Sequence, residues 1–81
     1  MPRQSPYKIV LTQSEREALE TISRKYTSPY RDVIRAKIVL LAAQGLENKQ
    51  IGERLDVLRQ IVSKWRRRFF QERVAGLEER S

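Results

Sequence analysis

Apolar residues recur at helical spacing in four separate stretches of the chain, and this pattern predicts an all-α fold of four helices. The first stretch begins with a T-x-x-E pattern from Thr12 to Glu15, which is typical of a capping box at the start of a helix. Leu19 and Ile22 lie on its apolar face, and its charges nearly cancel. We therefore expect a packing helix that ends near Lys25.

The second stretch has the densest apolar pattern. Ser28 is a suitable N-cap and Pro29 a suitable first helical residue, so a helix is expected from about Tyr30 to Gln44. Gly45 then fits the left-handed residue that follows many helices. Because the apolar positions extend beyond one face, this should be the most buried helix of the fold.

The third and fourth stretches, from Asn48 to Phe70, have the spacing of a helix-turn-helix. Such a motif needs an apolar and a small residue where the two helices touch, and a turn residue that tolerates positive φ. It also needs an apolar residue after the turn and apolar residues on the second helix. The positions that meet these requirements are Ile51, Gly52, Leu55, Asp56, Val57, Val62 and Trp65.

The fourth helix should begin near Leu58 or Arg59, end around Glu72 and have two different faces. With successive residues about 100° apart, one side is apolar and packs on the core. That side carries Ile61, Val62, Trp65 and Phe69. The opposite side carries hydrogen-bonding and cationic groups, namely Gln60, Ser63, Lys64, Arg67 and Gln71.

This second face has the chemistry of a helix that lies in a DNA groove. Long donors directed at base edges read sequence, and cations at the sides of the helix hold phosphates. The predicted base contacts are Gln60, Ser63, Lys64 and Arg67. The predicted phosphate contacts are Arg59, Arg66 and Arg68 on the fourth helix and Arg31 and Arg35 on the second.

The charge of the chain agrees with a polyanionic partner. Its 81 residues include 17 Lys and Arg against 10 Asp and Glu, which gives a net charge of +7. A basic amphipathic helix is often no more than a solvated surface. Here, however, the cations concentrate on the helix that the turn pattern separately selects as the recognition helix, and the combination favours binding of double-stranded DNA.

The composition argues against an enzyme. The chain has no histidine and no cysteine, only two aspartates, and no glycine-rich phosphate loop. We expect no catalytic residue, no metal site, no cofactor and no small-molecule ligand. No apolar run approaches the roughly 20 residues that span a bilayer, and the N-terminus lacks the apolar core of a signal peptide. These features predict a cytoplasmic protein without a membrane partner.

The pattern also suggests boundaries. Residues 1–10, with two prolines and no helical periodicity, are expected to form a flexible N-terminal arm. Residues 11–73 should form the helix-turn-helix DNA-binding domain. Residues 74–81 should form a C-terminal tail or the start of a linker.

Three blocks of the sequence resemble the N-terminal DNA-binding region of bacterial insertion-sequence transposases related to the mariner superfamily. They are LTQSEREALE, RAKIVLLAAQGLENKQIGERLDV and RQIVSKWRRRFFQERVAGLEER, which together cover most of the chain. The segment VSKWRRRF followed by GLE is the most specific part. The sequence departs from the common family pattern at Asp56, where glycine is usual, and at Leu58, where serine or threonine is usual.

The resemblance implies a homeodomain-like fold that binds the terminal inverted repeats of a mobile element, near the bacterial nucleoid. It also implies a separate ribonuclease-H-like domain with an Asp-Asp-Glu or Asp-Asp-Asp metal site, which this sequence does not contain. An excised domain, a truncated product and a stand-alone protein all remain open. A homodimer on paired DNA ends also remains open.

Three alternatives stay beside this interpretation. The first is a stand-alone transcriptional regulator with the same DNA-binding motif. The second is a protein-interaction or dimerisation module that uses Phe70, Val74 and Leu77 as exposed apolar groups. The third, RNA binding, is less favoured because few aromatic residues are available to stack on unpaired bases.

Overall fold

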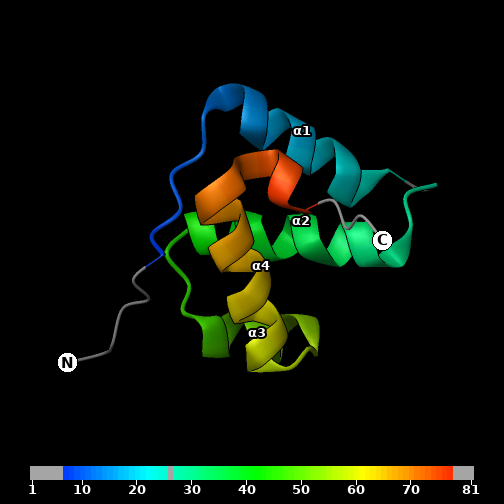
Figure 1. The fold of residues 1–81 in the computed structure, drawn as a ribbon. Helices are drawn as coiled ribbons and strands as arrows, with labels where there is room; N and C mark the ends of the chain where they lie inside the picture. The colour runs from blue at the N-terminus through cyan, green and yellow to red at the C-terminus, as the bar shows by residue number, and fades with distance from the viewer. Residues whose placement is uncertain (1–6, 26, 78–81) are drawn as a thin grey trace.

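Four α-helices and a short 3-10 helix make up the regular structure of the described residues (Figure 1). The computed structural model describes residues 7–25 and 27–77, and this part of the chain contains no strand. The all-α, four-helix prediction is therefore confirmed. The elements are α1 (Gln13–Arg24), α2 (Tyr30–Ala43), α3 (Asn48–Leu55), α4 (Arg59–Glu72) and η1 (Arg73–Leu77).

The helix α2 is the centre of the arrangement. On one side α1 packs along it, and on the other side α3 and α4 pack against it and against each other (Figure 1). After α4 the chain turns back as η1, which contacts both α4 and α2. The buried apolar residues form one core, made by Ile9, Leu19, Ala36, Ile38, Val39, Ala42, Ile51, Val62, Trp65, Phe69 and Leu77.

The N-terminus of α1 is capped as the sequence predicts. The backbone N–H of Glu15 donates to Thr12 Oγ1 over 3.1 Å, and the Thr12 N–H donates to Glu15 Oε1 over 3.0 Å. This reciprocal pair is the predicted capping box, and it satisfies two N–H groups that the first turn of a helix leaves unpaired.

The ends of α2 agree with the prediction at one terminus only. Gly45 has a φ of 96°, and the N–H of Leu46 donates to the Leu41 carbonyl over 3.3 Å, as expected of a left-handed helix end. At the other end Pro29, and not Ser28, occupies the N-cap position, and no side chain caps the helix. The predicted Ser28 cap is wrong because the first helical residue is Tyr30 and not Pro29, so Pro29 takes the N-cap position.

The described parts of the expected arm and tail belong to the core. In the segment predicted as a flexible arm, Ile9 is buried. In the segment predicted as a tail, Gly76 and Leu77 are buried. The expected boundaries at residues 10 and 73 are therefore too narrow, because Ile9 belongs to the apolar core and η1, which ends at Leu77, contacts α4 and α2. Residues 1–6 and 78–81 of these predictions lie outside the described residues.

The buried position of η1 depends on a close backbone approach. A Cβ atom added to Gly76 would collide with the carbonyl oxygen of Arg68 on α4. Only glycine allows η1 to lie this close to α4, and this contact directs Leu77 into the core.

Arg73 joins the two ends of the described chain at the start of η1. Its Nη2 donates to Glu15 Oε1 over 2.5 Å and to the Val10 carbonyl over 2.7 Å, and its Nε donates to Glu15 Oε2 over 2.8 Å. Its backbone has a φ of 60°, an uncommon value for a residue with a side chain. The Arg73 hydrogen bond is the largest influence that lowers the pKa of the Glu15 carboxyl, from 4.5 to about 2.

Candidate nucleic-acid interface

A tight turn connects α3 and α4 and fixes the direction of α4. Asp56 has a φ of 58° and a ψ of 47°, so it takes the left-handed conformation predicted for the turn. The N–H groups of Asp56 and Val57 both donate to the carbonyl of Gly52. A Cβ atom on Gly52 would lie 2.8 Å from the Val57 carbonyl oxygen, which explains why the smallest residue stands there. The predicted helix-turn-helix is thus present.

The core side of α4 agrees with the predicted pattern except at one position. Val62, Trp65 and Phe69 are buried, and Ile51 of α3 is buried with them. Ile61, also predicted for the core, is 40% exposed. The prediction fails because α4 packs through the sector around the three buried residues, and Ile61 lies at the edge of that sector.

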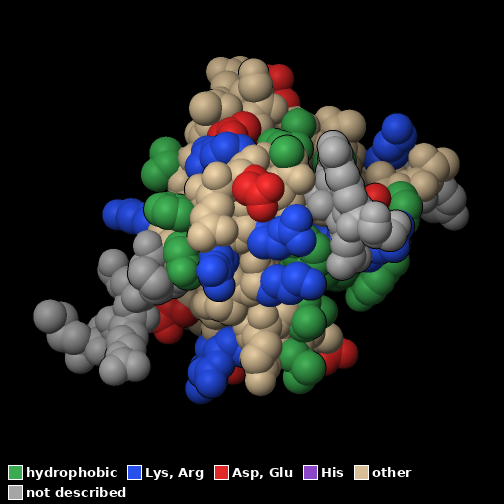
Figure 2. Space-filling view, in the orientation of Figure 1, with side chains coloured by type: hydrophobic (Ala, Val, Ile, Leu, Met, Phe, Trp, Pro, Cys, Tyr) green, Lys and Arg blue, Asp and Glu red, His purple; other side chains and the backbone are tan. Residues whose placement is uncertain are grey.

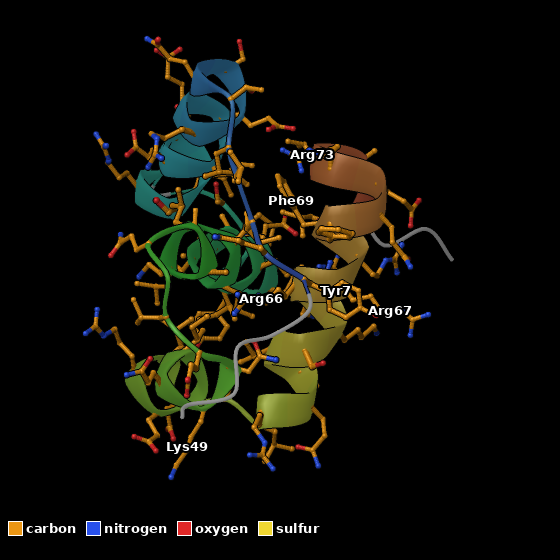
Figure 3. All side chains as sticks on the ribbon, turned by 90° about the vertical axis from the view of Figure 1, so that its left-hand side faces the viewer. Tyr7, Lys49, Arg66, Arg67, Phe69 and Arg73 are labelled. Carbon is orange, nitrogen blue, oxygen red and sulfur yellow. The ribbon has the colours of Figure 1, made fainter. Side chains whose placement is uncertain are left out.

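The opposite side of α4 carries the four predicted base-contacting residues. Gln60, Lys64 and Arg67 are exposed, and Ser63 is half-buried. Their spacing along the helix places them on one face. The side chain of Arg67 points away from the body of the domain (Figure 3). Lysine and arginine side chains gather over α4 in the space-filling view (Figure 2), so this face is both polar and cationic.

Arg66 was predicted to hold a phosphate, and this prediction is wrong. Its side chain points into the domain (Figure 3), and the residue is only 5% exposed. Its Nε donates to the Tyr7 carbonyl over 2.7 Å, and its Nη1 donates to the Leu46 carbonyl and to Asn48 Oδ1 over 2.9 and 3.0 Å. Burial lowers the pKa of this guanidinium, while these three acceptors support its charged form.

Arg35 is a second buried arginine, and its predicted phosphate contact is also wrong. It is 8% exposed, and its Nη1 donates to the Leu77 carbonyl over 3.2 Å. Its guanidinium carbon lies 3.9 Å from the centre of the Trp65 ring. This stacking arrangement joins α2, α4 and η1 through a cation and an aromatic ring. Arg35 therefore acts in the core.

The remaining predicted phosphate contacts differ in exposure. Arg59 at the start of α4 and Arg31 on α2 are exposed and available to a polyanion. Arg68 is half-buried, lies 4.0 Å from Glu72 and stands 5.4 Å from the Trp65 ring centre. Its charge is thus partly engaged within α4.

A model of the homeodomain-like domain family matches residues 29–78. The chain belongs to this family. The match runs from the start of α2 through η1, so it includes the helix-turn-helix and its core. No curated protein and no solved structure matches the chain.

Membership in the homeodomain-like family relates the polar face of α4 to DNA binding. In helix-turn-helix and homeodomain proteins the second helix of the motif lies in the major groove of double-stranded DNA. The exposed face of α4 is accordingly the candidate nucleic-acid interface of this homeodomain-like domain.

The structure adds one cation that the sequence pattern did not single out. Lys49, in the first turn of α3, is exposed and lines a shallow depression beside the turn together with Arg59. Glu53 and Asp56 line the same depression, so its charge is mixed. The position of Lys49 relative to α4 depends on the geometry of the turn. The spacing of charged residues along the sequence does not predict this geometry.

Two further observations concern the described part of the chain. No helix there is long and apolar enough to cross a membrane. Within the same residues, acidic side chains nowhere cluster in threes or more as a metal ion would require.

Proposed function

We propose that this homeodomain-like domain reads a specific sequence of double-stranded DNA with α4, as the terminal-inverted-repeat recognition module of an insertion-sequence transposase. The proposed reading of DNA is supported above all by the division of α4 into two faces. Trp65 and Phe69 anchor one face in the core, and Gln60, Lys64 and Arg67 stand exposed on the other.

The exposed side chains have complementary partners in the major groove. The amide of Gln60 can pair with the N6 and N7 edge of adenine, and the guanidinium of Arg67 can donate to O6 and N7 of guanine. Arg59 stands at the start of α4, where a phosphate of the groove edge would lie within its reach. Base-edge contacts set the sequence preference, and the cations add affinity that weakens with salt.

The link to transposition is supported by the resemblance of the three sequence blocks to insertion-sequence transposases. In that proposal the domain supplies recognition only. Strand cleavage and joining belong to a separate catalytic domain that carries its own carboxylates and metal ions. The domain itself is proposed to have no enzymatic activity.

Selection from random double-stranded oligonucleotides, followed by sequencing of the bound pool at two salt concentrations, tests this function. We expect an enriched motif of several base pairs that persists at the higher salt concentration. A match between that motif and inverted repeats flanking a catalytic reading frame supports the transposase assignment, whereas a match in promoters without such repeats contradicts it. Binding that is equal for all sequences and disappears with salt contradicts sequence reading altogether.

Arg67→Ala and Arg24→Ala form a matched pair for this experiment. Both arginines are exposed, but Arg24 lies on α1, where it forms an ion pair with Glu20 over 3.4 Å. Arg67→Ala should relax one position of the motif, and Arg24→Ala should leave the motif unchanged. Equal effects of the two variants would mean that Arg67 contributes only its charge.

A further inference from the structure

Two large apolar side chains are exposed where α4 begins. Leu58, the N-cap residue, is 70% exposed, and Ile61 one turn later is 40% exposed. Between them stand Arg59 and Gln60, both exposed. Hydrophobic side chains also show at the surface at this end of α4 in Figure 2. The apolar pair thus lies at the end of α4 where Gln60, the first of the base-contacting candidates, stands.

The stability of the domain does not explain a leucine at this N-cap. No side chain caps α4, and residues with a hydroxyl or a carboxyl oxygen stabilise a helix start that leucine leaves unassisted. Ile61 is excluded from the fully buried core. Both residues therefore place apolar surface in water in the unbound domain.

We propose that Leu58 and Ile61 contact the 5-methyl groups of thymines in the major groove, next to the base read by Gln60. This inference rests on the proposed DNA-reading function. The thymine methyl is the apolar group that the base edges present in the major groove, and apolar side chains recognise it. The N-terminal residues of a recognition helix are those that approach base edges, and Leu58 to Ile61 are these residues in α4.

The surroundings of the pair favour DNA over a protein as the occupant. Arg59 and Lys64 are exposed on α4. Leu58 lines the depression of mixed charge, where Lys49 and Arg59 stand beside Glu53 and Asp56. Cations around a small apolar patch suit a polyanion that carries isolated methyl groups. Two side chains also offer far less surface than a stable protein interface requires.

The test replaces each thymine of the selected site, one at a time, with deoxyuridine, which removes only the 5-methyl group. Binding of the 81-residue chain to each duplex is measured by titration at constant salt. For the wild-type chain, we expect one or two substitutions near the base read by Gln60 to weaken binding about 3- to 4-fold each, as the loss of one buried methyl predicts. The other substitutions should have no effect.

Variants then assign the methyl groups to side chains. Leu58→Ala and Ile61→Ala should each bind the thymine and deoxyuridine forms of their own position equally well. Val10→Ala is the matched control, because Val10 is also 70% exposed but lies far from α4 in sequence and outside its polar face. Val10→Ala should keep the full preference for thymine.

Leu58→Ser separates this role from a role in folding. A serine at the N-cap can accept a hydrogen bond from the first turn of α4 and should raise the thermal midpoint, while the preference for thymine falls because serine has no methyl group. If the wild-type chain selects a motif but binds all deoxyuridine forms equally, the methyl inference is wrong and the reading function stands. The same holds if the motif lacks thymine at these positions. If the chain selects no motif, the proposed function itself fails.

Discussion

Arg66 and Arg67 are adjacent in sequence and identical in chemistry, yet they have opposite surroundings in the domain. Arg66 points inward and donates to three acceptors, whereas Arg67 points outward from the polar face of α4 (Figure 3). One helical step turns the side chain by about 100°, and this step separates the core side from the exposed side. A count of cations along α4 cannot distinguish the two.

The partners of Arg66 explain the difference. They come from the segment before α1 and from the start of α3, with Tyr7, Leu46 and Asn48 supplying the acceptors. Tyr7 also packs edge-on against Phe70, with ring centres 5.4 Å apart. Arg66 is therefore a structural cation that attaches the N-terminal segment to α4, and Arg67 is free to serve recognition.

The largest effect should come from Arg66→Ala. The substitution leaves two partly buried carbonyls and Asn48 Oδ1 without their donor, so we expect a loss of about 2–4 kcal/mol of unfolding free energy in urea denaturation. Arg67→Ala is the matched control and should change that free energy by less than about 0.5 kcal/mol. Similar losses for the two variants would remove the distinction between them.

The second effect concerns affinity for DNA. Arg67→Ala should weaken binding to the selected site by about 1–3 kcal/mol while binding to a scrambled site changes much less, because a base contact is lost. Competition titration with both duplexes measures this difference. A uniform loss on both duplexes would make Arg67 a phosphate contact.

The third effect is a pH dependence of the unfolding free energy. It comes from Arg73, a second anchoring cation, and its partner Glu15. Its partner Glu15 has a folded pKa of about 2 against an ordinary value of 4.5, mainly because of the Arg73 hydrogen bond. The folded pKa is the lower one, so the pair's stabilisation is complete above pH 4.5 and is lost as the pH falls towards 2. Since Arg73 is partly exposed to solvent, we expect a contribution of about 1–2 kcal/mol.

Urea denaturation at a series of pH values between 2 and 6 measures this contribution. Glu15→Gln should remove most of the pH dependence in that window. Glu17→Gln, which changes an exposed carboxyl on the same helix, should retain it. An unchanged pH dependence in Glu15→Gln would show that the ion pair does not stabilise the fold.

The smallest effect should come from Arg59→Ala. Arg59 is exposed at the start of α4 and is expected to contact a phosphate. Its removal should weaken binding to all sequences by a few-fold and reduce the slope of log affinity against log salt by about 1. Loss of preference at a single base pair would instead make Arg59 a base-reading residue.

Much of the fold follows from local sequence chemistry. The capping box at Thr12, the left-handed Gly45 and the turn at Asp56 were all predicted from residue types at fixed spacings, and all are present. Each depends on contacts within a few residues, which local patterns encode. The same is true of the two faces of α4, apart from Ile61 at the edge.

The errors at Ile9, Leu77, Arg35 and Arg66 concern contacts between distant segments. Ile9 and Leu77 enter the core, and Arg35 and Arg66 find their acceptors 18 to 59 residues away along the chain. No periodicity specifies which cation meets which carbonyl. An arginine at the edge of the core is therefore predicted to contact phosphate from the sequence, although in the fold it is a structural residue.

Base reading by the exposed face of α4 is tested most directly by oligonucleotide selection with the wild-type chain, Gln60→Ala and Arg67→Ala in parallel. If these two side chains read bases, each variant should lose preference at one position of the motif and keep the others. Identical motifs in all three proteins, with only weaker binding overall, would show that α4 does not read bases through them.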